Sequence, residues 1–273
     1  MAEPVVLSGS SLATFLKCAK QWELAYVYRI KSRPGLKMVL GIAAHRAIEI
    51  TLEQKIKTKV ELPLSDIQDA FVDTFKVEAE DAVEKPDKKE TKPIYQDSGV
   101  KSLETWYRDV SPGVHPVMVE QNGQFTINGI PYDWTIDAVD ANDAEAWLDG
   151  HVGHDGENVV RDWKFVGRRP DGSSEYILNM IGYAIGYRRL TGGIEAGVQL
   201  DHIVRLKEPV YVPIAGDTIS DQDIRAFFSI LDVTKKSIDA GLFPPTGLKS
   251  GACSYCGYFD ICEYYKGPRK RNP

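Results

Sequence analysis

The sequence lacks several features that would place it in whole classes of protein. No apolar run approaches the roughly 18 residues that a membrane-spanning helix needs. The first ten residues, MAEPVVLSGS, do not show the basic-then-apolar pattern of a signal peptide. The chain also shows no internal repeat. We therefore expect a soluble, cytoplasmic protein with no membrane partner.

An excess of positive charge is also missing. The 33 Lys and Arg residues are outnumbered by 39 Asp and Glu residues, and the net charge is −6. Proteins that bind nucleic acid commonly carry a basic surface, so this balance weighs mildly against such a partner. Local basic stretches do occur at Arg168-Arg169, at Arg188-Arg189 and from Lys266 to Arg271. Carboxylates that bind metal would also lower the net charge, so the total decides little.

Hydrophobic residues make up 43% of the 273 positions, enough for one substantial core. We expect one domain with a helical insertion. In the first part of the chain, apolar residues recur at spacings of three and four, which predicts helices. These helices are expected from Ser8 or Ser10 to Tyr28, from about Gly41, from Ser65 to Val83, and from Val100 to Arg108. Cys18 then falls on the first helix and His45 on the second.

Short β-rich runs separated by turn residues follow these helices. They are VHPVMVE, QFTING, IPYDWTIDAVD, AEAWLDG and NVVRDWKF, and later QLDHIVRL and PVYVPI. Further helices are expected at about 174–190 and at 221–240. The tail from Phe243 is rich in Pro, Gly and Cys and has too few apolar positions for a core of its own. The pattern predicts an α/β protein built around a sheet.

Cysteine is scarce, and its spacing is unusual. Cys253, Cys256 and Cys262 lie together near the end, whereas Cys18 lies about 235 residues upstream. A cytosolic chain keeps its thiols reduced, which disfavours disulfides, and unrelated buried thiols are the other plain explanation. A metal site is favoured over both. Four thiolates can hold zinc or an iron–sulfur cluster, although structural zinc sites usually have two close pairs rather than one cysteine plus three.

The segment Asp162-Trp163-Lys164 lies in a run that reads as a strand. The D/E-x-K pattern alone means little, since it recurs at Glu53-Gln54-Lys55 and at Asp87-Lys88-Lys89. On a strand, however, residues two apart point to the same side, so Asp162 and Lys164 would be adjacent, with the Trp163 carbonyl between them. Such a group suits metal-assisted hydrolysis, although ordinary strand charges would give the same pattern.

A second acid and a histidine could complete this group. Asp137 follows an apolar stretch in IPYDWTIDAVD, and with Asp162 it could hold a hard divalent cation through oxygen. His45 lies in GIAAH on an expected helix, where a lone histidine is more often structural than a ligand. Added to two carboxylates, an imidazole would shift the preference from magnesium toward manganese.

Taken in order, the motifs cover most of the chain and resemble those of one family. They are SxxxFLKCAKQWELAY, GIAAH, IDAVD, RDWKF, a helix with Tyr183, and the cysteine tail. The chain is similar to the RecB-like iron–sulfur nucleases of the PD-(D/E)XK superfamily, including the CRISPR-associated RecB-like exonucleases and the AddB nuclease domain. The resemblance implies a restriction-endonuclease-like mixed sheet flanked by helices, and it suggests a phage origin, in which case the location is the host cytoplasm.

The resemblance also implies roles for particular residues. His45, Asp137, Asp162 and the Trp163 carbonyl would bind Mg²⁺ or Mn²⁺, and Lys164 would position or activate water. The four cysteines would hold one [4Fe-4S] cluster: Cys18, Cys253, Cys256 and Cys262. Residues 1–30 and 243–273 would form the cluster-binding part, 41–110 a mainly helical part, and 114–214 the nuclease sheet. The family cuts DNA, commonly single strands from an end, and its members work alongside recombination or replication proteins.

The sequence departs from the family pattern at two places. Family members usually have glutamine where this chain has Asn179, one turn before Tyr183, and asparagine has a shorter reach. A long insertion contains His151 and His154, which we interpret as hairpin residues rather than a second metal site.

Several aromatic residues lie near the expected site: Trp163, Tyr176, Tyr183 and Tyr187. Most of them are expected in the core, although some could stack on unpaired bases.

Three alternative functions remain open: a structure-specific or double-strand endonuclease, a non-catalytic iron–sulfur DNA-binding accessory protein, and a zinc-containing binding module. The sequence assigns no oligomeric state.

Overall fold

The computed structural model of the protein describes residues 5–84, 90–148, 156–170 and 177–264. It divides into two compact units. Unit 1 comprises residues 1–33, 124–134 and 221–273, and unit 2 comprises residues 34–123 and 135–220.

The sheet is mixed, with the strand order β1-β3-β4-β5-β6 and with β2 paired to β3. Its long strands are β2 (Pro116–Ile127), β3 (Ile130–Ala141), β4 (Asn158–Val166), β5 (Gly197–Val204) and β6 (Val210–Asp217). In unit 2, β4 runs antiparallel to β3 and parallel to β5, with Ala138 opposite Arg161 and Asp162 opposite Leu200. The β2–β3 hairpin turns at Asn128-Gly129, where both residues have positive φ, as a tight two-residue turn requires.

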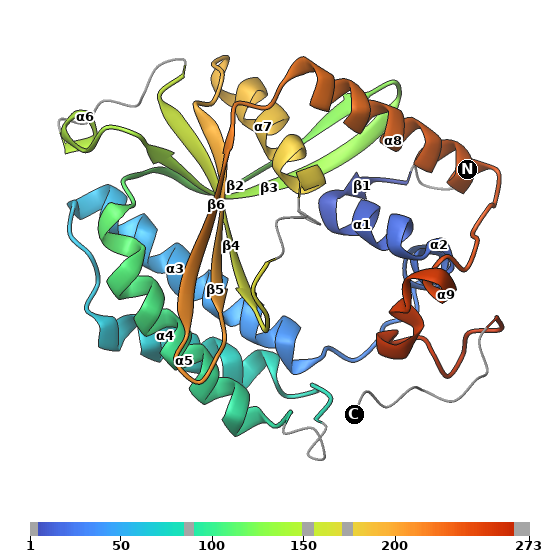
Figure 1. The fold of residues 1–273 in the computed structure, drawn as a ribbon, viewed down its shortest axis with the longest axis horizontal. Helices are drawn as coiled ribbons and strands as arrows, with labels where there is room; N and C mark the ends of the chain where they lie inside the picture. The colour runs from blue at the N-terminus through green and yellow to red at the C-terminus, as the bar shows by residue number, and fades with distance from the viewer. Residues whose placement is uncertain (1–4, 85–89, 149–155, 171–176, 265–273) are drawn as a thin grey trace. The chain divides into compact units, whose positions relative to one another are not determined.

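Helices cover β4 on two sides in unit 2. The described helices of unit 2 are α3 (Leu36–Thr58), α4 (Leu64–Glu78), α5 (Lys92–Asp109), α6 (Ala144–Leu148) and α7 (Ile177–Thr191), with a 3-10 turn η3 (Ser111–Gly113). Of these, α3, α5 and α7 contact β4. Apolar residues of α3, α4 and α5 form one core with Trp163 of β4, whose ring meets Trp106 edge-on. On the other side, the Asn158 side chain of β4 donates a hydrogen bond to the Tyr187 hydroxyl of α7. Figure 1 shows the arrangement of these helices and strands.

Unit 1 contains helices from both ends of the chain. They are α1 (Gly9–Lys17), α2 (Ala19–Trp22), the π-helix η1 (Glu23–Val27), α8 (Asp221–Asp239), α9 (Gly247–Ser250) and the 3-10 turn η4 (Ala252–Tyr255). Ser8 caps α1 in a capping box with Ser11, which confirms one of the two expected N-caps. The short strand β1 (Leu7–Ser8) pairs in parallel with Tyr132 and Asp133 of β3.

The structure confirms the mixed sheet flanked by helices and corrects three local predictions. Cys18 is not inside a helix, because its backbone is extended (φ −162°, ψ 105°) and separates α1 from α2. The runs VHPVMVE and QFTING belong to one strand, β2. AEAWL forms α6 rather than a strand, with the Trp147 indole donating to the Pro116 carbonyl. In the described part of the chain, no helix is long and apolar enough to cross a membrane.

Candidate metal centre and cysteine site

Strand β4 presents Asp162 and Lys164 side by side, because alternate residues of a strand point to the same face. The Lys164 ammonium donates to Asp162 Oδ1 at 2.7 Å, and Oδ2 lies 2.5 Å away. Asp162 is fully buried. Burial raises the pKa of Asp162 to about 6, although the Lys164 charge acts in the opposite direction. The pair therefore places one acid and one cation in a site largely shielded from water.

The neighbouring strand β3 adds Asp137. Because β3 and β4 are paired, the Trp163 N–H can reach across and donate to Asp137 Oδ2 at 2.9 Å. Burial is the largest single influence and raises the pKa of Asp137, but His45, the Lys164 charge and the Trp163 N–H together outweigh it, so the pKa of Asp137 is lowered. Asp137 thus stays ionised while its backbone contact fixes its position relative to Trp163.

Helix α3 brings His45 to the same place. Its Nε2 lies 2.9 Å from the Trp163 carbonyl oxygen and its Nδ1 lies 3.2 Å from Asp137 Oδ2. Burial disfavours a charged ring, but the Asp137 carboxylate outweighs this effect and the pKa of His45 is raised. The sequence-predicted residues His45, Asp137 and Trp163 therefore meet in one connected group.

Glu120 of β2 is a residue that the sequence reasoning missed. One ligand atom each from His45, Glu120 and Asp137 lies within 4.8 Å of the other two. The backbone of Glu120 has φ +48°, in the left-handed region, which non-glycine residues seldom adopt and which clusters at functional sites. Burial and the nearby Asp137 charge raise the pKa of Glu120 to about 7. The only sequence signal was an acid at the end of the apolar run VHPVMVE.

The donor set fits a hard divalent cation. One imidazole nitrogen and two carboxylate oxygens are the ligand types that Mn²⁺ and Mg²⁺ accept, and neither cation needs sulfur. Asp162 lies close enough that the charges of Asp137 and His45 both change its pKa. The site can therefore combine a carboxylate cage for metal with one ammonium group, that of Lys164.

The opposite face of β4 carries a buried ion-pair network. Arg161 donates through Nη1 to Asp140 of β3 at 2.6 Å and through Nε to Asp201 of β5 at 2.9 Å. The Tyr211 hydroxyl of β6 also donates to Asp201. These bonds connect four strands directly behind Asp162, so they restrict sliding of β4 relative to β3.

Helix α7 holds the remaining sequence-predicted residues. Asn179 and Tyr183 are half-buried and lie about one turn apart on the helix, which packs on β4. Their roles stay predictions. Trp163 and Tyr187 are each 2% exposed, which confirms that these two rings belong to the core and are closed to bases. Tyr176, His151 and His154 lie outside the described residues.

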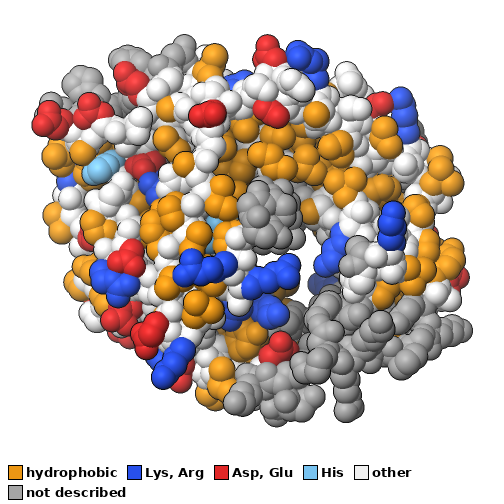
Figure 2. Space-filling model, viewed as in Figure 1, with side chains coloured by type: hydrophobic (Ala, Val, Ile, Leu, Met, Phe, Trp, Pro, Cys, Tyr) orange, Lys and Arg blue, Asp and Glu red, His pale blue; other side chains and the backbone are white. Residues whose placement is uncertain are grey.

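Basic side chains follow the carboxyl ends of the parallel strands β4 and β5. Arg168 and Arg169 come after β4 and are exposed, and half-buried Arg205 and exposed Lys207 come after β5. Figure 2 shows Lys and Arg side chains gathered over the part of unit 2 where β4 and β5 lie. The end of the sheet next to Lys164 is therefore locally positive, although the chain as a whole is acidic.

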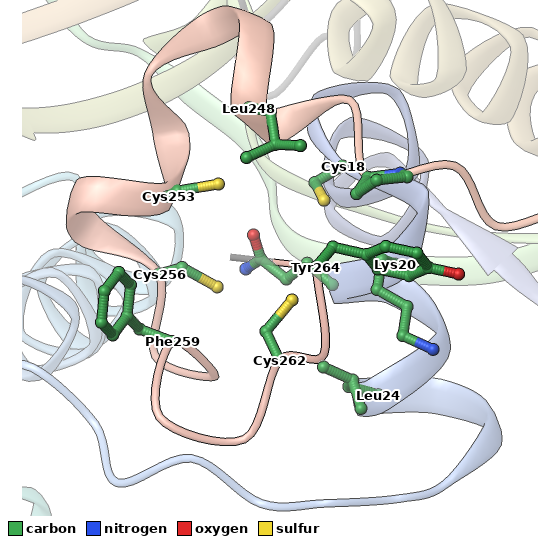
Figure 3. Close-up of a pocket in the computed structure, with 11 residues that line it drawn as sticks. Cys18, Lys20, Leu24, Leu248, Cys253, Cys256, Phe259, Cys262 and Tyr264 are labelled. Carbon is green, nitrogen blue, oxygen red and sulfur yellow. The ribbon is translucent and has the colours of Figure 1, made fainter. Parts of the chain in front are cut away.

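In unit 1, the four cysteines line one pocket. Figure 3 shows their sulfurs directed toward a common space, with Cys18 on the N-terminal segment and the other three on the tail. Apolar side chains of Leu24, Leu248 and Phe259 line the same pocket. All four thiols are free. Within the described residues, no three of these sulfurs come within 4.8 Å of one another.

The tail is attached to the N-terminal segment around this pocket. The Thr246 hydroxyl donates to the Lys17 carbonyl at 3.2 Å, and Lys20 pairs with Glu263 at 2.7 Å. A Cβ on Gly247 would lie 3.3 Å from Cys18 Sγ and 3.5 Å from Cys253 Sγ, so a side chain there would intrude between the two sulfurs. Burial raises the pKa of Cys253, and the neighbouring cysteines raise it further.

Comparison with known proteins identifies the family. No curated protein matches the chain. Among solved structures, it is similar to the crystal structure of a "Putative exonuclease" from Eubacterium rectale, with a TM-score of 0.59 and 10% sequence identity over 96% of this chain and 90% of that chain. At this identity the likeness concerns the fold alone. The family model of the PD-(D/E)XK nuclease superfamily matches residues 6–263. Since that match spans nearly the whole chain, this protein belongs to the PD-(D/E)XK nuclease superfamily, whose members are metal-dependent hydrolytic nucleases.

Proposed function

We propose that the chain is a Mg²⁺- or Mn²⁺-dependent exonuclease that shortens single-stranded DNA from an end during recombination, repair or replication. The observation that carries this proposal is the group formed by His45, Glu120 and Asp137 beside the Asp162–Lys164 pair. Three carboxylates, one imidazole and one ammonium meet there on strands and a helix that also form the core. A purely structural role would not require so many buried and half-buried charges in one place.

The roles of the side chains follow from their chemistry. His45, Glu120, Asp137, Asp162 and the Trp163 carbonyl would hold one or two cations. A bound cation would lower the pKa of a water ligand and offset charge on the phosphate. Lys164, held by Asp162, would orient the water and place its ammonium near the negative charge that develops during hydrolysis. The ion-pair network of Arg161 keeps both acids in register.

For the cysteine site, we propose a [4Fe-4S] cluster with a structural role. In a tetrahedral zinc site with bonds of about 2.3 Å, each sulfur would lie only about 3.8 Å from the other three. No three of the described cysteine sulfurs lie as close together as such a zinc site requires, which supports the larger cluster. The apolar lining of the pocket also suits a cofactor shielded from water. In the part of the tail that the structure describes, up to residue 264, the helices are short, so ligand binding would supply much of its folding energy.

The test is nuclease activity of anaerobically purified protein on end-labelled DNA. Single strands, duplexes and circular single strands should each be incubated with Mg²⁺, Mn²⁺ or EDTA, and the absorption spectrum and iron content should be recorded. We expect metal-dependent shortening of linear single strands, no cutting of circles, and a brown protein. Cutting of circles would instead identify an endonuclease. A brown protein with no cleavage in either metal would identify a non-catalytic accessory protein.

A further inference from the structure

Unit 1 contains an exposed segment in which two tyrosines are followed by three basic residues. Tyr26, Val27, Tyr28 and Ile30 are 44%, 48%, 59% and 38% exposed. Arg29, Lys31 and Arg33 lie between and after them and are also exposed. Four large apolar side chains so close together on a surface are unusual, and such a patch commonly marks a binding site.

The charge of this segment is opposite to that of the chain. From Leu24 to Arg33 there are three basic residues and no acidic residue, whereas the whole chain has a net charge of −6. A partner with negative charge and flat apolar groups would complement the segment on both counts. Single-stranded DNA has both features, because its phosphates are charged and its unpaired bases offer ring faces.

The segment is held in a defined shape. The Tyr28 N–H donates to the Glu23 carbonyl and the Ile30 N–H donates to the Leu24 carbonyl, both at 3.0 Å. The Tyr26 ring stacks on Trp22, with centroids 5.2 Å apart and an interplanar angle of 22°. Trp22 is buried and stacks in turn on Phe243 at 5.9 Å. Tyr26 is therefore the outermost ring of a stack of three. Because its side chain is already held in place, it would lose little conformational entropy when a ligand binds.

The cysteine tail supports the same segment from the other end of the chain. Tyr258, which lies between Cys256 and Cys262, donates its hydroxyl to the Ile30 carbonyl at 2.9 Å. A Cβ on Gly257 would lie only 3.1 Å from the Ser32 Cβ, so the two backbones approach closely. An ordered tail would therefore also hold the exposed segment in place.

We propose that residues Tyr26 to Arg33 form a binding surface for single-stranded DNA. The rings of Tyr26 and Tyr28 stack on unpaired bases, and Arg29, Lys31 and Arg33 contact the phosphates. The proposal rests on the proposed nuclease function and adds to it a surface, formed by side chains outside the metal centre, that selects unpaired strands. A duplex offers the same phosphates but hides its base faces, so it would bind this surface less well.

The ring contribution is tested by fluorescence anisotropy of a labelled oligo-dT strand in EDTA, so that no cleavage occurs. Tyr28→Ala should weaken binding about tenfold, within the range for loss of one base–aromatic stack. The matched variant Tyr28→Phe keeps the ring and should keep the affinity. On an abasic strand of the same length, Tyr28→Ala should bind like the wild type. Equal affinity of Tyr28→Ala and wild type for oligo-dT would overturn the proposal.

The charge contribution is tested by the salt dependence of the same binding. Replacing Arg29, Lys31 and Arg33 together with Gln should reduce the slope of log affinity against log salt by about 2, since each phosphate contact contributes about 0.7. As a control, Lys76→Gln with Lys101→Gln, two exposed sites of unit 2, should leave the slope unchanged. An unchanged slope in the triple variant would refute the phosphate contacts.

These readouts are independent of catalysis. A protein that cleaves nothing would still show the effects of the variants on binding, which would leave the surface supported and the nuclease proposal refuted. An active nuclease whose binding is unaffected by them would refute only the surface. Iron content and melting temperature should match those of the wild type in every variant, which excludes loss of the fold as the cause.

Discussion

The two candidate metal sites are built in opposite ways. In unit 2, the ligands project from long strands and a 23-residue helix, and they are bonded to one another: His45 to Asp137 and to the Trp163 carbonyl, and Trp163 N–H to Asp137. In unit 1, three of the four cysteines lie on a tail whose helices have four residues each. The first group is part of a core, whereas the second joins segments that have little core of their own.

This difference separates two uses of metal. A site made by the fold exists before the ion binds, so removing the ion should stop chemistry and leave the structure. A site whose residues are ordered only by the bound metal or cluster should lose its local structure when that group is removed, because the binding energy then supplies the folding energy. The comparison can be tested from both sides.

The largest expected effect is on catalysis in unit 2. Asp162→Asn should lower kcat at least about a hundredfold, because it removes the charge of one proposed metal ligand and the charged partner of Lys164. The melting temperature should change little, because the amide can still accept the Lys164 hydrogen bond. Initial rates on linear single strands and thermal melts measure both.

The control for this variant is Glu53→Gln, which alters the second D/E-x-K match, exposed on α3. It should retain full activity. If Asp162→Asn were as active as Glu53→Gln, the assignment of the metal centre would be wrong.

The next effect should fall on the stability of unit 1. Cys256→Ser should lose the iron and destabilise the tail by several kcal/mol, because a thiolate ligand that contributes to folding is lost. Limited proteolysis with mass spectrometry should then show early cleavage after residue 243. Wild-type protein in EDTA should resist the protease under the same conditions, since only the unit 2 ion is removed. Retained iron and a protected tail in Cys256→Ser would contradict the proposed cluster.

The sequence predicted the parts of the molecule that depend on periodicity and order. The period of two in NVVRDWKF placed Asp162 and Lys164 on one face of β4, and the helical period in GIAAH placed His45 on α3. The order of the motifs indicated the mixed sheet. These features are local or topological, so one sequence contains enough information to predict them.

Features that depend on backbone detail were not predictable. Glu120 reaches the centre from a residue with φ +48°, and a plain alternation of apolar residues does not indicate such a bend. Cys18 interrupts a helical pattern with one extended residue, although its neighbours alone favour a continuous helix. AEAWL becomes a helix whose Trp147 bonds to Pro116, a contact 31 residues away. In each case a tertiary contact or a local backbone conformation outweighs local propensity.

A smaller effect concerns pH at the metal centre. Burial raises the pKa of Glu120 from its ordinary value of 4.5 to about 7, and His45 also holds its proton more tightly than usual. Metal must displace these protons, so affinity for Mn²⁺ should rise as pH increases toward and through 7. The stability of the metal-free protein changes with pH in the opposite direction to the metal affinity. The pKa of Glu120 is higher in the folded protein than in the unfolded chain. The free energy of unfolding therefore falls as pH rises from about 4.5 to 7.

Glu120→Gln separates these contributions. It should weaken Mn²⁺ binding and flatten the pH dependence that remains near 7, as measured by calorimetry between pH 5.5 and 8. It should also reduce the loss of metal-free stability over the same interval. A wild-type affinity and pH profile in Glu120→Gln would exclude this residue from the ligand set.

The smallest effect tests whether the fold holds the metal centre at many points. The Asn158 amide donates to the buried Tyr187 hydroxyl at 3.0 Å and connects β4 to α7. Tyr187→Phe should cost about 1 kcal/mol, a decrease of a few degrees in Tm, and should leave kcat unchanged because other contacts still position β4. Tyr183→Phe, on the same helix but only half-buried, should lower kcat/KM severalfold if its hydroxyl meets the substrate. Equal effects of the two substitutions on kcat would mean that α7 positions the site as a whole, and the unit 2 centre would then depend on one helix contact much as the cysteine site depends on its tail.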